Sequence, residues 1–286
     1  MNIKTNRLFS FFITTIIYGI ATVLSLLFYT LLPYDFWLNL LLADIFGTVI
    51  IFIFSLILKT ASVYDPYWSV QPIVILTFFF IGKQFSLVRL LILIIVCIWG
   101  VRLTANWAYT FTNLLYQDWR YTMLKDKTKK LYPIVNFLGI HLFPTIVVYL
   151  CVLPAVFVME MEIMQNVWSI IILLISLFAI ILQGTADYQM HTYRKHRNTT
   201  FIRTGLWKNC RHPNYLGEIL MWWGVGLSSI LALNGYCYLL IGTIVNTLMF
   251  LFISIPMADK RMSKKEGFEE YKKQTRMLIP IKKFTK

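Results

Sequence analysis

A cluster of polar side chains opens one of the apolar segments of this 286-residue chain, within the stretch GLWKNCRHPNYLGEILMWWG at residues 205–224. The side chains that could do chemistry there are Arg211, His212, Asn214, Tyr215 and Glu218. A guanidinium donates paired hydrogen bonds that suit phosphate, and a carboxylate accepts hydrogen bonds from hydroxyl or amide groups. The cluster therefore predicts a site for a polar, phosphate-bearing ligand.

Two further polar groups recur at helical spacing. The first is Arg102, Asn106, Tyr109 and Asn113, which leads into the sequence DWRY at 118–121. The second is Gln183, Asp187, His191 and Arg194. Residues spaced by three or four positions share one face of a helix. Each group begins inside an apolar segment and ends beyond it, which predicts two polar stripes that descend out of a membrane.

The residue types of these three groups fit a dinucleotide. Arginines, including Arg120 and Arg203, suit phosphates. Asp187 and Glu218 can accept hydrogen bonds from ribose hydroxyls or a carboxamide, and Trp and Tyr faces can cover a flat ring. The glycine-rich motif of soluble dinucleotide-binding folds is absent, because GVGLSS at 224–229 lacks the third glycine. A nucleotide would therefore bind between helix ends and cytoplasmic loops.

The elements that position these residues are predicted to be membrane helices. Apolar residues make up 58% of the chain and charged residues 14%, against roughly 45–50% and about 25% in soluble domains. Apolar runs predict spans at 8–32, 36–59, 68–82, 86–109, 133–158, 167–189, 213–233 and 236–257, of which the third is short. We expect an all-α polytopic membrane protein of about eight transmembrane helices, with the first helix retained rather than cleaved.

The distribution of basic residues predicts that both chain termini are cytoplasmic. With eight spans, all Lys and Arg residues except Lys83, Arg89 and Arg102 fall in segments on the inner side. The net charge of +14 comes from these basic segments, which we expect to lie against anionic membrane lipids. A nucleic-acid partner is not expected, because no soluble basic domain or binding motif is present. Within the spans, Asp44, Arg89 and His141 are isolated ionisable residues whose role is left open between structure and function.

Two simpler explanations of the polar groups compete with a ligand site. Membrane helices routinely carry Trp, Tyr and Arg anchors at the interface, but anchors do not require acids such as Asp187 and Glu218 one turn or more inside a helix. A metal site from His191, His196 and His212 is disfavoured, because these spacings match no metal motif. The set as a whole favours a ligand site without a metal.

The motifs resemble a known family. RTGLW at 203–207, RHPNYLGE at 211–218, WWG at 222–224 and the closing EEY and LIP look like the C-terminal domain of the steroid 5-alpha-reductase family. SVYDPYWS at 62–69, WGVRL at 99–103 and DWRY at 118–121 resemble its bacterial branch, known as DUF1295. The resemblance extends over most of the chain from about residue 60.

The resemblance implies NADPH-dependent reduction of a carbon–carbon double bond conjugated to a ketone, in a lipid-like or steroid-like substrate that enters from the bilayer. Asn214 and Glu218 would lie at the nicotinamide, and Asp65 would grip the substrate carbonyl. The expected catalytic residues are Asp65, Tyr64, Tyr67 and Glu218. The expected cofactor-binding residues are Arg102, Asn106, Asp118, Arg120, Tyr121, Gln183, Asp187, Arg194, Arg203, Arg211, His212, Asn214, Tyr215 and Glu218. The surplus of arginines near 194–211 favours NADPH over NADH.

RHPNY is shared with isoprenylcysteine carboxyl methyltransferases, so an S-adenosylmethionine-dependent membrane methyltransferase is the alternative activity, and a non-catalytic membrane protein is a third possibility. Residues 1–34 are expected to add one helix to a reductase-like domain at 35–286. The bacterial branch implies a bacterial inner membrane. The substrate's identity and the oligomeric state are not predicted.

Overall fold

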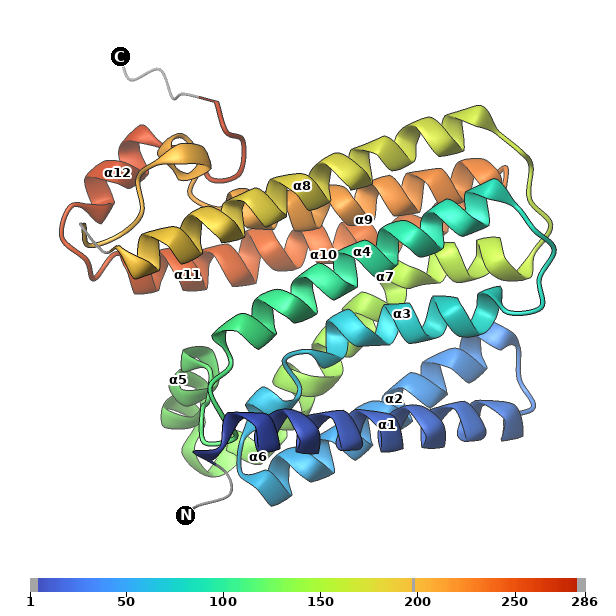
Figure 1. Cartoon of the computed structure of the whole chain (residues 1–286), viewed down its shortest axis with the longest axis horizontal. Coiled ribbons are helices and arrows are strands. Elements are labelled where there is room, and N and C mark those ends of the chain that lie inside the picture. Colours follow the sequence, from blue (N-terminus) through green and yellow to red (C-terminus); the bar gives the residue numbers. More distant parts are fainter. Residues whose placement is uncertain (1–4, 197–198, 282–286) are drawn as a thin grey trace. The chain divides into compact units, whose positions relative to one another are not determined.

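The computed structural model describes residues 5–196 and 199–281, and over these residues it is helical and contains no strand (Figure 1). The helices are α1 (Arg7–Leu31), α2 (Phe36–Leu58), α3 (Tyr67–Phe80), α4 (Leu87–Thr110), α5 (Trp119–Thr128), α6 (Tyr132–Val135), α7 (Phe143–Glu160), α8 (Val167–Lys195), α9 (Pro213–Ala232), α10 (Ile241–Met249), α11 (Ile255–Met262) and α12 (Phe268–Gln274). The predicted all-α class is confirmed.

Each of the eight predicted spans coincides with a helix, and seven helical segments of the described chain are long and apolar enough to cross a membrane. Two of these seven include π-helical turns, at Asn136–Leu142 before α7 and at Phe250–Ser254 between α10 and α11. The remaining predicted span is α3, which has 14 residues. At 1.5 Å per residue α3 is about 21 Å long, shorter than the roughly 30 Å hydrocarbon core of a bilayer. The chain is a polytopic membrane protein.

The chain divides into two compact units. Unit 1 holds the residues up to 83 together with 99–159, and unit 2 holds 84–98 together with the residues from 160 onward. The division falls inside α4, whose first half belongs to unit 2 and whose second half belongs to unit 1. The expected separation of residues 1–34 from 35–286 remains a prediction.

In unit 1, two hydrogen bonds hold the turn between α2 and α3. α2 ends at Lys59, which has a left-handed backbone with φ of 59°, and a short 3-10 turn follows at Ala61–Val63. The Tyr18 hydroxyl of α1 donates to the Val63 carbonyl at 2.7 Å, and the Thr60 hydroxyl donates to the Tyr116 carbonyl at 2.9 Å. These bonds hold the segment that carries Asp65.

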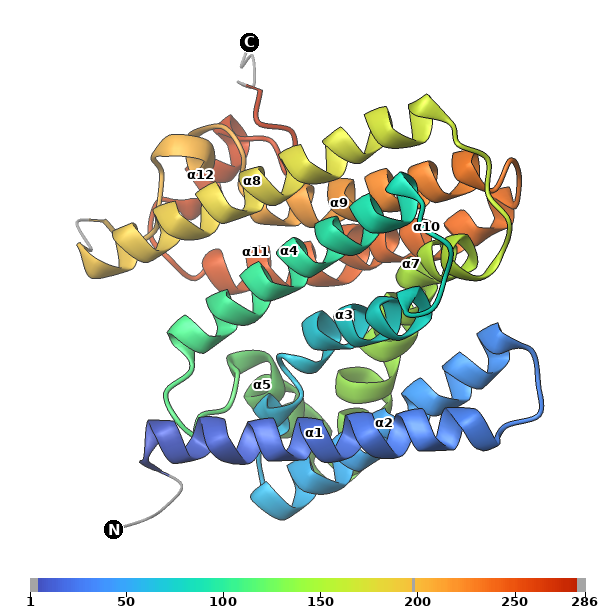
Figure 2. The ribbon, with the colours of Figure 1, turned by 45° about the vertical axis from the view of Figure 1, so that its right-hand side comes forward.

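In unit 2, α8 and α9 run side by side along most of their lengths (Figures 1 and 2). Two glycines of α9 permit the close approach: a Cβ on Gly217 would meet the Ala179 carbonyl oxygen at 2.7 Å, and a Cβ on Gly224 would meet the Ser176 backbone nitrogen at 2.9 Å. The Ser176 hydroxyl donates to the Met221 carbonyl at 2.9 Å. Small residues at such contacts let membrane helices pack backbone to backbone.

The segment after α11 folds back onto the loop between α8 and α9. Phe268 and Tyr271 of α12 pack against Phe201, and the Tyr271 hydroxyl donates to the Trp207 carbonyl. The Arg211 backbone N–H then donates to the Arg276 carbonyl at 3.0 Å. The basic tail up to residue 281 is therefore part of the folded structure of unit 2.

Candidate functional site

In unit 1, the structure brings the SVYDPYWS and DWRY motifs together around Asp65. The Tyr121 hydroxyl donates to Asp65 Oδ1 at 2.6 Å. The Asp118 backbone N–H donates to the Ser62 hydroxyl at 3.0 Å. Asp118 also caps α5, because its carboxylate accepts from the Arg120 backbone N–H at 2.8 Å. Two motifs 56 residues apart thus form one polar cluster.

The protonation of Asp65 is set by these surroundings. Burial raises the pKa of its carboxyl to about 7 from an ordinary value of 3.8, while the hydrogen bond from Tyr121 and the nearby Arg120 guanidinium lower it in part. The side chain lies in the turn before α3 and keeps some solvent exposure. At neutral pH Asp65 can therefore donate or accept a proton.

The other predicted residues of unit 1 surround this cluster or precede it on α4. The Arg120 guanidinium pairs with Asp118 at 2.8 Å and is 49% exposed, so part of its surface is open to a ligand. Arg102 and Asn106 are half-buried on α4, and Tyr109 is exposed. Asn113, the last member of the predicted stripe, follows α4 and is half-buried.

Tyr64 and Tyr67 bind other partners than Asp65. The Tyr64 hydroxyl lies 2.8 Å from the Thr145 hydroxyl, and the Tyr67 hydroxyl donates to Asp44 Oδ1 at 3.0 Å. Their rings are 5.5 Å apart, so they pack together while their hydroxyls reach different partners. A catalytic role for either tyrosine remains a prediction.

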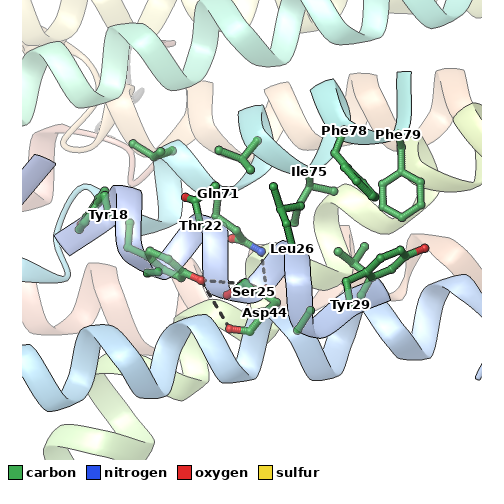
Figure 3. Close-up of a pocket in the computed structure, with 16 residues that line it drawn as sticks. Tyr18, Thr22, Ser25, Leu26, Tyr29, Asp44, Gln71, Ile75, Phe78 and Phe79 are labelled. Carbon is green, nitrogen blue, oxygen red and sulfur yellow. Dashed lines mark hydrogen bonds between the residues drawn. The ribbon is translucent and has the colours of Figure 1, made fainter. Parts of the chain in front are cut away.

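Asp44 belongs to a site that the motifs did not indicate. It lines a cavity of about 60 Å³ between α1, α2 and α3, and it accepts a hydrogen bond from the Gln71 side-chain amide in addition to that from Tyr67 (Figure 3). The sequence did indicate Asp44 as an acidic residue inside an apolar span, and burying an acid there without partners is energetically costly. Those partners come from α3, at a separation in sequence that no helical spacing reveals.

In unit 2, Glu218 lies buried at the contact between α8 and α9. Gln183 Nε2 donates to Glu218 Oε2 at 2.8 Å, and Trp222 Nε1 donates to Glu218 Oε1 at 3.1 Å. Nearby, Gln183 Oε1 and Asn214 Oδ1 are buried and accept no hydrogen bond from the described residues. Buried acceptors usually accept a hydrogen bond from a donor. A ligand that binds at this junction could supply the two missing donors.

The remaining polar residues of α8 follow the expected gradient. Gln183 is buried, Asp187 and His191 are half-buried, and Arg194 is exposed. Arg203 in the following loop is exposed as well, and its guanidinium lies 4.2 Å from the centre of the Phe201 ring. Polar side chains thus become more exposed along α8, from the buried Gln183 to the exposed Arg194.

Arg211 and His212 are both bound to Asp259 of α11. Arg211 Nη2 lies 3.2 Å from Asp259 Oδ2, and His212 Nε2 lies 2.9 Å from Asp259 Oδ1. Arg211 also donates to the Thr275 carbonyl at 2.9 Å, and Tyr215 stacks on the His212 ring at 5.2 Å. Asp259 was not predicted as a site residue, because its partners lie 48 and 47 positions away in the sequence.

A metal site does not emerge from these groups. Within 5–196 and 199–281, no three His, Cys, Asp or Glu side chains gather as metal ligands would. The donors near Glu218 are amides and an indole, which bind a carboxylate as hydrogen-bond partners.

Residues 51–275 match a protein family described as "Protein of unknown function (DUF1295)". The chain belongs to the DUF1295 family. One relative, an uncharacterized protein of Schizosaccharomyces pombe, is 29% identical over 218 residues, which are 65% of this chain and 62% of the relative. The chain thus spans less than two thirds of that relative's length. No solved structure matches the chain.

The DUF1295 match contains every predicted site residue, from Tyr64 to Glu218. It begins after Asp44, so α1 and the first half of α2 lie outside it. The cavity beside Asp44 is therefore built from both matched and unmatched parts of the chain, with Tyr67 and Gln71 inside the match.

Proposed function

We propose that this DUF1295 protein is a membrane-embedded, NADPH-dependent reductase of a conjugated carbon–carbon double bond in a lipid-like or steroid-like substrate. The resemblance of its motifs to the steroid 5-alpha-reductase family suggests the reaction. The membrane helices agree with a substrate that enters from the bilayer. The location proposed with it, a bacterial inner membrane, rests only on the resemblance of SVYDPYWS, WGVRL and DWRY to the bacterial branch of that family.

The observation that carries the proposal is the pair of unsatisfied acceptors, Gln183 Oε1 and Asn214 Oδ1, beside the buried Glu218. A buried acceptor without a partner costs about 1–3 kcal/mol. The carboxamide of a nicotinamide carries two N–H donors, so it could satisfy both oxygens. When bound, NADPH would supply a hydride to the β carbon of the substrate.

In this proposal, the polar residues of α8 and the loop after it bind the ribose and the phosphates of the cofactor. Asp187, one turn from Gln183, would accept hydrogen bonds from ribose hydroxyls, and the exposed Arg194 and Arg203 would bind phosphates. Arg211 and His212, which directly precede α9, are bound to Asp259 of α11. Their contribution would be to position Asn214, two and three residues further along the chain.

Asp65 and Tyr121 would act on the substrate in unit 1. Hydride addition to the β carbon places negative charge on the ketone oxygen, which a nearby donor stabilises most strongly where water is scarce. Asp65, with a pKa of about 7, is protonated in part at neutral pH and could donate to that oxygen. The Tyr121 hydroxyl would hold the carboxyl in place. As the resemblance implies, Arg102 and Arg120 would bind ribose or phosphate groups of the cofactor, and Asn106 and Asp118 would bind the cofactor as well.

Ligand titration of the purified protein in detergent tests the cofactor. We expect NADPH to raise the melting temperature, because a ligand at 100 times its Kd stabilises the folded state by about 2.7 kcal/mol. Replacing Gln183→Met should remove this shift, whereas Gln274→Met, which deletes the same amide from an exposed position of α12, should keep it. Oxidation of NADPH in the presence of a lipid-like enone would then establish the reaction.

Other ligands distinguish the alternatives. A shift with S-adenosylmethionine and none with NADPH would favour the methyltransferase and contradict the reductase. Equal shifts with NADPH and NADH would remove the claim that Arg194 and Arg203 recognise the 2′-phosphate. NADPH binding without oxidation by any enone would leave the cofactor assignment standing and overturn the reaction.

A further inference from the structure

The cavity beside Asp44 has a polar end and an apolar end. Figure 3 shows Tyr18, Ser25, Asp44 and Gln71 toward one end, and Tyr29, Phe78 and Phe79 toward the other. Water needs about 10–15 Å³ of such space, so about 60 Å³ has room for several water-sized groups. Water could occupy the polar end, but an apolar end of this kind stays dry.

Two polar atoms of the lining are buried and have no hydrogen-bond partner among the described residues: Ser25 Oγ of α1 and Gln71 Oε1 of α3. The amide nitrogen of Gln71 already donates to Asp44, which fixes the orientation of this amide and leaves its oxygen as a pure acceptor. Ser25 can donate one hydrogen bond and accept others. The cavity thus lacks one donor for Gln71 and one partner for Ser25.

A glycine keeps the space open at this end. A Cβ on Gly47 of α2 would lie 2.6 Å from Ser25 Oγ and 2.7 Å from the Tyr67 hydroxyl. Both hydroxyls therefore face the same small volume above Gly47. Any side chain at this position would fill part of that volume.

A hydroxyl group matches the missing partners. It would donate its hydrogen to Gln71 Oε1 and accept one from Ser25, while a hydrocarbon chain extended toward Phe78 and Phe79. A ketone does not match, because it donates nothing to Gln71. An ammonium group fits less well, since both Asp44 oxygens already accept from neutral donors and a buried charge is costly to desolvate.

We propose that the cavity between α1, α2 and α3 binds the hydroxyl end of a lipid-like alcohol through Ser25 and Gln71. The site goes beyond the proposed reduction, because it uses neither the acceptors of unit 2 nor the Asp65–Tyr121 pair. α1 supplies Ser25, and the family match does not include that helix.

Photolabelling of the full-length protein in detergent, without NADPH, tests this site. The probe is a dodecanol that carries a diazirine near its hydroxyl, and labelled peptides are mapped by mass spectrometry. We expect labels on the cavity-lining parts of α1, α2 and α3. Unlabelled 1-dodecanol should compete about tenfold better than its methyl ether, which has lost the donor, and better than 2-dodecanone.

Variants connect the labelling to the named atoms. Ser25→Ala and Gly47→Ala should each lower labelling several-fold, whereas Ser228→Ala should not change it. Ser228 is a matched control, because its hydroxyl is also buried and has no partner within the part of the chain that the structure describes, but it lies on α9 in unit 2. Size-exclusion profiles and melting temperatures establish that each variant is folded, and Ser25→Ala is the smallest change.

Four results would overturn the proposal: equal competition by the alcohol and its ether, labels outside α1 to α3, unchanged labelling of a folded Ser25→Ala protein, or stronger competition by dodecylamine. The last would identify a cation as the ligand. Because NADPH is absent from every arm, failure of this experiment leaves the proposed reductase untouched, and a negative NADPH titration leaves this site untouched.

Discussion

Asp65 shows how a residue acquires a property that its type does not predict. Its motif was recognisable in the sequence, but burial in the fold raises its pKa, and Tyr121, Arg120 and Asp118, from a segment more than 50 residues away, adjust it further. Similarly, the sequence pointed to Glu218 and Gln183 separately, and only the packing of α8 on α9 joins them. Asp44 was noticed in the sequence as an acid inside a span, but its partner Tyr67 was not predicted, and Asp259 was not singled out, because the partners of both lie far away in the sequence.

The pH dependence of Asp65 provides a prediction at this scale. Because the folded pKa of about 7 lies above the ordinary 3.8, the folded state holds the proton more tightly than the unfolded state. The contribution of Asp65 to stability is therefore full below pH 4 and is lost as pH rises toward 7. We expect Asp65→Asn to flatten the melting temperature between pH 4 and 7, and to lower enone turnover by about 10²-fold.

Asp126→Asn is the control, since Asp126 is an exposed carboxylate on α5. It should leave both the pH profile and the turnover as in the natural protein. A profile of Asp65→Asn that still declines from pH 4 to 7 would show that another group is responsible. Full turnover of this variant would exclude Asp65 as the donor to the substrate oxygen.

At the scale of elements, apolar runs predicted where the long helices lie, because a bilayer demands about 20 consecutive apolar residues. The polar end of α8, which continues to Lys195 beyond the predicted span 167–189, carries no such signal. α5 and α12 were not predicted. They are short and polar, and α12 is held by Phe268 and Tyr271 packing on Phe201. Helices this short depend on tertiary contacts, so their own sequence carries little signal.

The close contact between α8 and α9 predicts that an alanine substitution destabilises the protein at Gly224 but not at Gly19, which lies on α1. Gly224→Ala would place a methyl group 2.1 Å from Ser176 Oγ and 2.9 Å from its backbone nitrogen. The backbone cannot move aside without separating the helices, so we expect a loss of about 1–3 kcal/mol in unfolding free energy. Gly19→Ala on α1 meets nothing within 4 Å and should stabilise by up to about 1 kcal/mol, through helix propensity alone.

Denaturation of both variants in one detergent measures these effects. Because Gly224 lies two turns from Glu218, separation of the helices should also weaken the hydrogen bond from Gln183 and with it NADPH binding. If Gly224→Ala and Gly19→Ala had equal melting temperatures, the close approach of α8 and α9 would not limit stability.

For the whole molecule, the number of membrane crossings decides whether the two termini lie on the same side of the membrane. Seven helical segments of the described chain are long enough to cross, and seven crossings would place the two termini on opposite sides. The basic residues favour eight, with both termini in the cytoplasm, and the eighth can only be α3. With 14 residues, α3 would need local thinning of the bilayer or help from its flanking turns to cross.

Single cysteines decide between seven and eight crossings. In a Cys237→Ser background, which removes the exposed native thiol, we would introduce Lys83→Cys, Lys125→Cys, Glu162→Cys or Lys264→Cys, all at exposed positions. If α3 crosses, a membrane-impermeant maleimide added to intact cells should label positions 83 and 162, and should label 125 and 264 only after the membrane is opened. The background protein should remain unlabelled. Because α4 crosses the membrane between them, positions 83 and 125 lie on opposite sides. Protection of position 83 together with labelling of position 125 in intact cells would therefore mean that α3 is re-entrant, and Asp65 would then lie in a loop that dips into the membrane rather than at the end of a crossing helix.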